Sequence, residues 1–402
     1  MDKYDIAIVG GGVAGCFAAL RIAQKHPDCK SIVFEFGRPF GKRRRQLEGA
    51  LGCFPAGDGK LYLRDFDRVL DIVDGRKVKP AQKWVTDTLG NAGPMKLTKD
   101  AAPNAATQKR FKEANFEIQL NDYIQWKPES VHQLSRNIAE AIDQSGNISF
   151  SFDNEVHKIY KKKGVFHIST ANGDFTAKQI ILCVGRSGWR WATKLYKELG
   201  LAVNDDKARF GVRVEMSAQY LREFNKSHCT ITKDNVEIGP LSWFGSVIPE
   251  DHADLVVSSF RSNEERWRSD RVSFSLLETR HFKDAGCYQT DRLGKLAFLL
   301  FNDRVSRERV RLFTKHASQL SLLPEYSWLN TRFQELDGLI PNLISRGYFH
   351  VPNILPIASE IRLGSNLESE IDGFFVAGES AGIRGIVAAA TMGTICADSA
   401  CR

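Results

Sequence analysis

The chain has 402 residues, of which 43% are hydrophobic and 26% are charged, as in an ordinary globular protein. It has no apolar run long enough to span a membrane, and its first strand begins too early to leave room for a signal peptide. We therefore expect a cytoplasmic protein. Its eight cysteines include no CxxC pair and its nine histidines no HxH or HExxH spacing, which excludes a zinc ribbon and a dithiol redox centre and predicts no metal site. The net charge of +8 allows anionic substrates or nucleic acid, but lysine-rich surface loops account for it more simply, and nucleic-acid binding is not expected.

The N-terminal stretch predicts a dinucleotide site. Residues 5–9 read as a buried parallel strand, and glycines 10, 12 and 15 follow it in GxGxxG spacing before a helix. Gly10 allows the tight turn, Gly12 lets the main chain approach a diphosphate, and Gly15 lets helix and strand pack closely. The helix start, with Val13 and Ala14, offers free N–H groups and the positive end of the helix dipole to phosphates.

A second strand, residues 31–36, carries Glu35, where a carboxylate can bond both hydroxyls of a ribose. Replacing Glu35 by Ala is therefore expected to weaken cofactor binding while the fold survives. The basic run 42–45, which includes Arg43, could contact cofactor phosphates or an anionic substrate, or could be a solvated helix start. Glycines 49, 52, 57 and 59 suit a loop that lies against a flat ring, or a plain connection.

The middle of the chain changes period near residue 146. Residues 65–73 and 82–89 look helical, 91–107 looks like a loop, and an amphipathic helix starts at Pro128 and ends at Ser145. Residues 148–152, 155–160, 165–170 and 175–184 then read as successive strands, with a hairpin turn at 172–174 between the last two. The last strand ends at Val184-Gly185, a second place where a cofactor could meet the main chain, and a helix follows over 189–199.

Residues 207–355 look like a second, mixed domain. Strands are expected at 210–216, which contains Arg213 and Glu215, and at 253–260. Helices are expected at 293–300 and 306–320, with Arg307, Arg309 and Arg311 on an exposed helix face.

The C-terminal stretch repeats the opening pattern. A short strand at 373–377 opens into the glycine-rich turn 378–385 and a helix of small residues, 386–400. The dipole of that helix could stabilise negative charge on a reduced ring. Three joints of strand, glycine turn and following helix indicate one extended cofactor.

These joints resemble those of FAD-dependent oxidoreductases of the glutathione-reductase-like flavoprotein superfamily, and the chain is similar to the FAD-dependent dehydrogenases of unassigned substrate within it. The matching stretches are 10–15 with Glu35, 56–61, 185–187, 210–215, 360–365 and 378–385. The resemblance implies an α/β fold with a Rossmann-like, three-layer ββα FAD-binding domain built from residues 1–75, 145–206 and 356–402. Residues 76–144 and 207–355 would form a mixed α+β substrate-binding or cap domain.

The resemblance also implies where FAD would bind. It implies that Gly10, Gly12 and Gly15, with Val13 and Ala14 at the helix start, hold the diphosphate, and that Glu35 holds the ribose. Val156 would pair with adenine through its backbone, and Gly185, preceded by Val184, would close over the adenosine side. Gly57, Asp58 and Lys60 would lie against the isoalloxazine, Gly378 and Glu379 at the ribityl phosphate, and Gly385 and Ile386, preceded by Arg384, near the flavin pyrimidine edge. Arg43 of the basic run is a further candidate for cofactor binding. The pattern departs from the group between residues 91 and 130, and it has Ile361 and Leu363 around Arg362 where the group has hydroxyl residues.

The function expected is hydride or electron transfer between FAD and a small, anionic organic substrate, with an external electron donor or acceptor as a possible partner. No second GxGxxG supports an NAD(P)H domain, and no cysteine pair supports disulfide reduction. The catalytic candidates are Lys60, Arg213 and Arg362, although an ion pair with Glu360 would equally explain Arg362. A flavin-dependent monooxygenase or halogenase, and an RNA-associated flavoprotein, are the alternatives; Trp189-Arg190-Trp191 echoes the halogenases but is read as packing.

Overall fold

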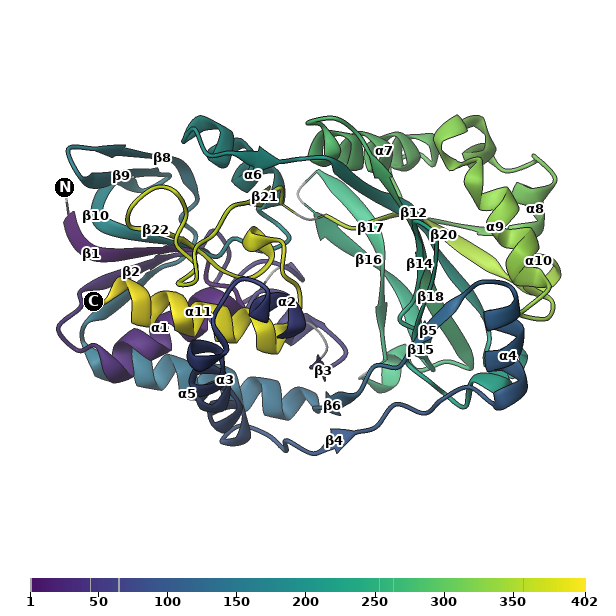
Figure 1. Ribbon diagram of the computed structural model, residues 1–402, viewed down its shortest axis with the longest axis horizontal. Helices are drawn as coiled ribbons and strands as arrows, with labels where there is room; N and C mark the ends of the chain where they lie inside the picture. The colour runs from purple at the N-terminus through teal and green to yellow at the C-terminus, as the bar shows by residue number, and fades with distance from the viewer. Residues whose placement is uncertain (1, 44, 64–65, 253, 263, 357) are drawn as a thin grey trace. The chain divides into compact units, whose positions relative to one another are not determined.

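The computed structural model describes residues 2–43, 45–63, 66–252, 254–262, 264–356 and 358–402 (Figure 1). Arg44 of the basic run, and Asp65 and Ala253 at the start of an expected helix and strand, lie outside the described residues. The chain divides into two compact units. Unit 1 comprises Met1–Leu97, Ile124–Asn204 and Ile357–Arg402, and unit 2 comprises Thr98–Tyr123 and Asp205–Pro356.

Unit 1 is built on a mainly parallel sheet. Its strands, in spatial order, are β7 (Ile148–Ser151), β2 (Ser31–Phe34), β1 (Asp2–Val9), β10 (Gly173–Leu182), β9 (Val165–Thr170) and β8 (Val156–Lys162), with β22 (Phe374–Val376) also paired to β10. Strands β7, β2, β1, β10 and β22 are parallel, whereas β9 and β8 form an antiparallel meander with the first half of β10. The predicted strands of this region are confirmed, and the meander's hairpin closes with Thr170 opposite Gly173.

The helices of unit 1 are α1 (Val13–Lys25), α2 (Phe66–Leu70), α3 (Gly75–Gly90), α5 (Pro128–Ser145), α6 (Trp189–Glu198) and α11 (Ile386–Ala400). Helix α1 packs against α11 and α5, and the three run side by side in Figure 1. Small residues allow the close approach of α1 and α11, because a Cβ added to Gly393 would lie 2.1 Å from the Ala14 carbonyl oxygen. The short strands β11 (Val203–Asn204) and β21 (Glu360–Ile361) pair separately.

The division of the chain differs from the expected one between residues 76 and 144. Helix α3 packs against α11 through a buried stripe that includes Val78, Val85 and Leu89, and α5 packs against α1. Residues up to Leu97 and from Ile124 therefore group with unit 1, and only 98–123 of this stretch belong to unit 2. The periodicity of a helix shows that one face is buried but not which element covers that face. For this reason the sequence does not show that both helices belong with the expected cofactor-binding segments, and it predicts them in the cap domain.

Unit 2 is built on an antiparallel sheet. Its strands, in spatial order, are β19 (Ser306–Arg309), β20 (Tyr348–Ile354), β12 (Lys207–Ser217), β18 (Arg271–His281), β14 (Val236–Ile238), β13 (Thr230–Lys233) and β5 (Glu117–Gln119), with β15 (Ser242–Trp243) also paired to β18. Strands β16 (Ser246–His252) and β17 (Leu255–Arg261) form a hairpin. The helices are α4 (Ala105–Glu113), α7 (Gly286–Leu300), α8 (Val310–Thr314), α9 (Trp328–Asp337) and α10 (Leu343–Arg346). The chain passes between the units within β4 (Leu97–Thr98) and β6 (Tyr123–Gln125), which form a small sheet in the order β3-β6-β4 with β3 (Lys60–Tyr62).

The two faces of the unit 2 sheet differ in chemistry. Val212, Val214 and Met216 on β12 are fully buried on one face. Phe349, opposite Val214, packs with aromatic rings of α8 and α9, which lie on that side of the sheet in Figure 1. Arg213 and Glu215 alternate with these valines and therefore project from the other face. This alternation builds an apolar core under the helices and leaves a polar sheet face.

Three expectations for secondary structure need correction. Residues 306–320 are not one helix: Arg307 and Arg309 lie on strand β19, paired with His350 and Tyr348 of β20, and only Arg311 lies on a helix, α8. Pairing with a strand far along the chain decides this conformation, and a local pattern does not show it. The stretch 91–107, expected as a loop, contains β4 and the start of α4, and the helix expected over 82–89 begins at Gly75.

The expected architecture is confirmed in outline: a Rossmann-like α/β unit assembled from separate segments, and a second mixed unit. Within the described ranges, no helix combines the length and apolarity needed to cross a membrane. The same ranges hold no group of three His, Cys, Asp or Glu side chains placed to bind a metal ion.

Candidate functional site

The structure brings the three glycine turns of the sequence together at one edge of the unit 1 sheet. Strands β1, β10 and β22 are parallel neighbours, so their carboxyl ends lie at the same edge, where open α/β sheets bind ligands. The turns themselves touch: a Cβ added to Gly10 would lie 2.5 Å from the Cys183 carbonyl oxygen, and one added to Gly378 would lie 3.5 Å from the Ala14 Cβ. Gly10 (φ +100°) and Gly378 (φ +66°) both need a backbone conformation that other residues rarely adopt.

The first turn has the features of a diphosphate cradle. Gly15 is held against the turn, because a Cβ there would lie 1.9 Å from the Gly10 carbonyl oxygen. Gly12 is different: its φ is −66° and a Cβ would meet only Cys183 O at 3.7 Å, so its glycine identity is not required by protein packing. Gly12 is also the N-cap of α1 and has no side chain to accept from the first helix amides, Val13 and Ala14 among them. An anion beside Gly12 would supply that acceptor.

Glu35 follows β2 and fastens three main-chain segments to one carboxylate. It is 4% exposed, and it accepts hydrogen bonds from the amides of Gly11 (2.7 Å), Gly37 (2.7 Å) and Gly49 (3.0 Å). Burial raises the pKa of Glu35, and the three amide donors oppose that rise. A carboxylate offers about four acceptor positions, so roughly one remains for a ribose hydroxyl.

The loop after β2 lies over the first turn. The Leu51 amide donates to the Gly11 carbonyl oxygen at 2.9 Å, and a Cβ on Gly52 would lie 3.4 Å from the Gly12 Cα. Arg43 shapes this loop by donating to the carbonyl oxygens of Gln46 (2.7 Å) and Ala50 (2.8 Å). Sequence reasoning missed Leu51; its positive φ of 64° is a feature that only the structure reveals.

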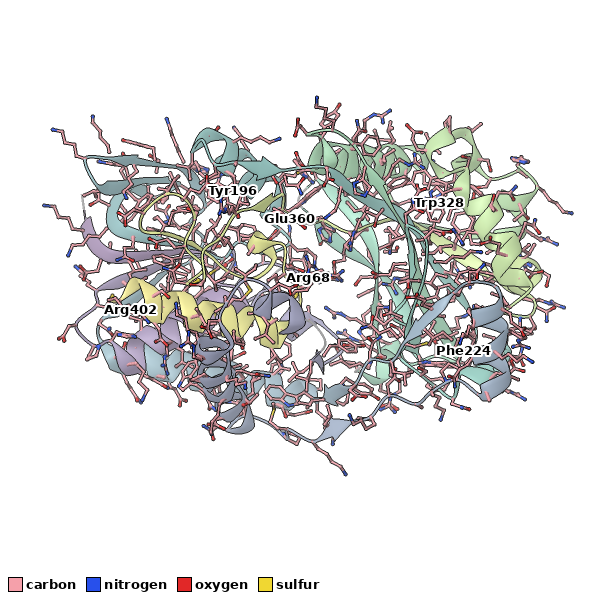
Figure 2. All side chains as sticks on the ribbon, in the orientation of Figure 1. Arg68, Tyr196, Phe224, Trp328, Glu360 and Arg402 are labelled. Atoms are coloured by element: carbon pink, nitrogen blue, oxygen red, sulfur yellow. The ribbon has the colours of Figure 1, made fainter. Side chains whose placement is uncertain are left out.

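The second and third turns are tied to each other by hydrogen bonds. The Val184 amide donates to the Ser380 hydroxyl at 3.1 Å, and the Tyr196 hydroxyl donates to the Ser380 carbonyl oxygen at 2.6 Å. Arg186 and Glu379 form an ion pair with Nε 3.3 Å from Oε1, beside Gly185. Burial raises the pKa of Tyr196, labelled in Figure 2, so its hydroxyl stays protonated. Tyr196 and Ser380 were missed in the sequence because neither belongs to a glycine motif.

The remaining predicted cofactor residues of unit 1 lie on other segments. Lys60, 8% exposed on β3, has its Nζ 2.6 Å from Asp58 Oδ2, and β3 contacts α11. Gly385 is the N-cap of α11, Ile386 is its first residue, and Arg384 precedes them. Gly57 ends the 3₁₀ turn before Asp58, and Val156 begins the outermost strand β8.

Arg362 and Glu360 do not pair with each other. The Glu360 carboxylate lies 3.9 Å from the Arg68 guanidinium (Figure 2), and Arg362 is exposed and makes no ion pair within the described part of the chain. The ion-pair reading of Arg362 is therefore wrong.

Unit 2 carries a row of polar side chains on the sheet face opposite its apolar core. Arg213 donates to the hydroxyls of Ser273 (3.3 Å) and Ser275 (3.0 Å) on β18. Directly paired residues share a face, so Arg213 stands beside His350 and Glu215 stands beside Tyr348.

Glu215 and His350 form a buried pair on this face, with His350 Nε2 3.2 Å from Glu215 Oε2. Arg307 donates to the same oxygen at 2.9 Å, and Arg271 lies 3.7 Å away. Burial opposes ionisation of Glu215, but His350 and the two guanidinium groups outweigh it, so the pKa of Glu215 is lowered. Burial also lowers the pKa of His350, which leaves the imidazole neutral at pH 7 and able to donate to the carboxylate.

Three guanidinium groups surround the Tyr348 ring on the same face. Their carbon atoms lie 3.6 Å (Arg307), 5.3 Å (Arg309) and 5.7 Å (Arg271) from the ring centroid. Sequence reasoning missed this cluster because it placed Arg307 and Arg309 on a helix. The strand conformation of this segment comes from its pairing with β20, which the local sequence does not show.

Comparisons with known proteins extend only to the fold. No family model and no curated protein sequence matches the chain. Among solved structures it is similar to glycine oxidase from Bacillus cereus (13% identity, TM-score 0.42, covering 99% of this chain and 95% of that one). It is also similar to L-alpha-glycerophosphate oxidase from Mycoplasma pneumoniae with FAD bound (14%, TM-score 0.45, 98% and 94%) and to NikD, an amino acid oxidase of nikkomycin biosynthesis (12%, TM-score 0.45, 100% and 94%).

Proposed function

We propose that the chain is an FAD-dependent oxidoreductase that moves a hydride or electrons between bound FAD and a small, anionic organic substrate. The observation that carries the proposal is the meeting of three glycine turns at the carboxyl ends of β1, β10 and β22. A mononucleotide or a transient nicotinamide needs fewer such joints than an extended dinucleotide does. Gly12 adds weight, because its lack of a side chain serves no packing need in the protein.

The residues of unit 1 would divide the binding of FAD among them. Diphosphate would lie at Gly10–Gly15 and the α1 amides, with one ribose hydroxyl at Glu35 and adenine along the backbone of Val156. The ribityl phosphate would lie near Gly378 and Glu379. Residues 57–60 and 384–386 would lie nearest the ring, where the N-terminus of α11 would stabilise negative charge. Bound FAD would supply the two-electron chemistry that no amino-acid side chain provides.

The anionic character of the substrate is proposed from unit 2. Arg213 is held by two serine hydroxyls on a polar sheet face, which orients a planar fork of donors suited to a carboxylate or phosphate. Arg362, exposed and without an ion pair to any described residue, is a second candidate for substrate binding. Lys60 is paired with Asp58, so its proposed part is to hold the 57–60 loop and its charge near the ring.

Anaerobic reduction tests the proposal. The purified protein is mixed, without oxygen, with a panel of amino acids, hydroxy acids and phosphorylated polyols, each matched to a neutral analogue such as the methyl ester. We expect at least one anionic compound to bleach the flavin absorbance while its neutral analogue does not. A flavin that no anionic metabolite reduces, but that consumes oxygen and hydroxylates a substrate in the presence of an external reductant, would favour a monooxygenase instead.

A further inference from the structure

The arginine cluster around Tyr348 carries more positive charge than its surroundings balance. Arg271 and Arg307 share a single carboxylate, that of Glu215, which also accepts from His350. Arg309 is exposed, and within the described ranges it has neither an ion pair nor a hydrogen bond from its side chain. Guanidinium groups so close together repel one another, and the repulsion is relieved most directly by an anion.

The geometry of the cluster suits an oxyanion. The Tyr348 ring offers its face to the guanidinium groups, with Arg307 at 3.6 Å from the centroid. A guanidinium that stacks through its flat face keeps its N–H groups free at the edge, which is where phosphate and carboxylate oxygens bind. The Arg271 and Arg307 side chains are 34% and 39% exposed, so a ligand from solvent reaches them.

The cluster also continues the row that contains Arg213. Arg307 pairs with His350, and His350 with Arg213, across β19, β20 and β12. Neighbouring strands lie about 4.8 Å apart, so the two arginines stand roughly 10 Å apart on one face. A small organic ligand spans that distance with one anionic group at each end.

We propose that Arg271, Arg307 and Arg309 around Tyr348 form a subsite for a phosphoryl group carried by the substrate, separate from the Arg213 position. The inference rests on the proposed function in taking the ligand to be the substrate. It narrows the substrate class to a phosphorylated organic molecule, since a dianion matches the excess charge better than one carboxylate.

Calorimetric titration of the full-length protein with inorganic phosphate tests the subsite, with acetate at equal ionic strength as the monoanion control. We expect phosphate to bind at least roughly tenfold more tightly than acetate, and Arg309→Gln to weaken phosphate binding by about tenfold, because a charge-assisted donor is lost. Among the described residues the exposed Arg309 side chain makes no ion pair or hydrogen bond, and its one contact in the cluster is with the Tyr348 ring, so the fold should survive the change. Arg311→Gln, an exposed arginine two residues along on α8, is the matched control and should bind phosphate as the wild type does.

A second pair of variants tests whether the Tyr348 ring is needed to hold the guanidinium groups in place. Tyr348→Phe keeps the ring and should retain phosphate affinity, whereas Tyr348→Leu should lose it. Equal phosphate affinity in Arg309→Gln and Arg311→Gln, or equal binding of phosphate and acetate, would overturn the subsite. Salt-sensitive binding of an unstructured RNA through Arg309, without binding of inorganic phosphate, would overturn it in favour of nucleic acid.

Flavin content measured on the same samples separates this inference from the proposed function. Protein that takes up no flavin even on reconstitution, but binds phosphate through Arg309, would refute the function and support an oxyanion site. Protein whose bound flavin is reduced by a substrate, but which does not bind phosphate, would refute only the subsite.

Discussion

At the scale of single residues, Glu35 shows where sequence reasoning reaches its limit. Its position directly after the second strand predicts a place beside the first glycine turn, and its carboxylate does accept from Gly11 of that turn. The sequence could not show that its carboxylate already holds the amides of Gly11, Gly37 and Gly49, since two of these belong to the loop that follows. The sequence predicts that the fold survives Glu35→Ala; these three hydrogen bonds lead us to expect a loss of stability as well.

We predict that Glu35→Ala destabilises the flavin-free protein by at least about 3 kcal/mol, because three buried amides lose their acceptor at a cost of about 1–3 kcal/mol each. Urea unfolding of the flavin-free protein measures this. Glu198→Ala, which removes an exposed partner of Lys194, is the control and should change stability by less than about 0.5 kcal/mol. A Glu35→Ala protein of unchanged stability that binds flavin poorly would restore the simpler role at the ribose.

His350 gives a prediction about pH. Its pKa in the folded protein is lowered from 6.5, chiefly by burial and further by Arg307 and Arg213, while Glu215 opposes the shift. The unfolded chain therefore takes up a proton first as pH falls, so this contribution to stability is complete above about pH 6.5 and is lost below it, by at most about 1.4 kcal/mol per pH unit. Glu215, whose pKa is lowered from 4.5, loses its contribution only at still lower pH, below its own unfolded value.

Urea unfolding at several pH values between about 7.5 and about 5 measures how the free energy of unfolding changes with pH. His350→Gln keeps an N–H donor for Glu215 but cannot titrate, so its stability should vary less over this range. An identical slope in both proteins would assign the titration to other groups.

At the scale of elements, the sequence predicted those with a strong local signal. The amphipathic stripe of α5, the strands of the meander and the small-residue helix α11 lie where their periodicity indicated. The failures share a cause: β19 is a strand because it pairs with β20, and α3 belongs to unit 1 because it packs on α11. Contacts with elements far away in the chain cannot be recognised from the local sequence pattern.

The packing of α1 on α11 supplies a prediction at this scale. Gly393→Ala should destabilise the protein by about 1–3 kcal/mol, because the new Cβ would lie 2.1 Å from the Ala14 carbonyl oxygen and the helices must separate. Gly90→Ala, where the Cβ meets only the flexible Met95 side chain at 3.7 Å, is the control and should be neutral within about 0.5 kcal/mol. Thermal unfolding measures both, and equal effects would mean that the α1–α11 spacing is not fixed by Gly393.

At the scale of the whole molecule, the two units carry different kinds of candidate binding site. Unit 1 places three glycine turns and a bare helix N-terminus at one sheet edge, and unit 2 carries a cationic sheet face. The sequence indicated the first because each of its glycine turns is a short contiguous motif, although the three lie far apart in the chain. It named Arg213 for the second but not Tyr348, His350 or the arginines beside them, since that face is assembled from four separated strands.

The most direct test of the central claim compares flavin binding with stability in Gly12→Ala. A Cβ at Gly12 lies 3.7 Å from its nearest protein neighbour, so the fold should tolerate it with a stability change below about 0.5 kcal/mol. The same methyl group occupies the space proposed for the diphosphate.

We therefore predict that wild-type protein releases FAD on denaturation, or takes it up on reconstitution. Gly12→Ala, titrated with FAD, should bind it at least roughly tenfold more weakly at unchanged Tm, equivalent to about 1.4 kcal/mol. Wild-type protein that binds no FAD, or a Gly12→Ala protein that binds it as tightly as wild type, would contradict the assignment of this turn as the cofactor site.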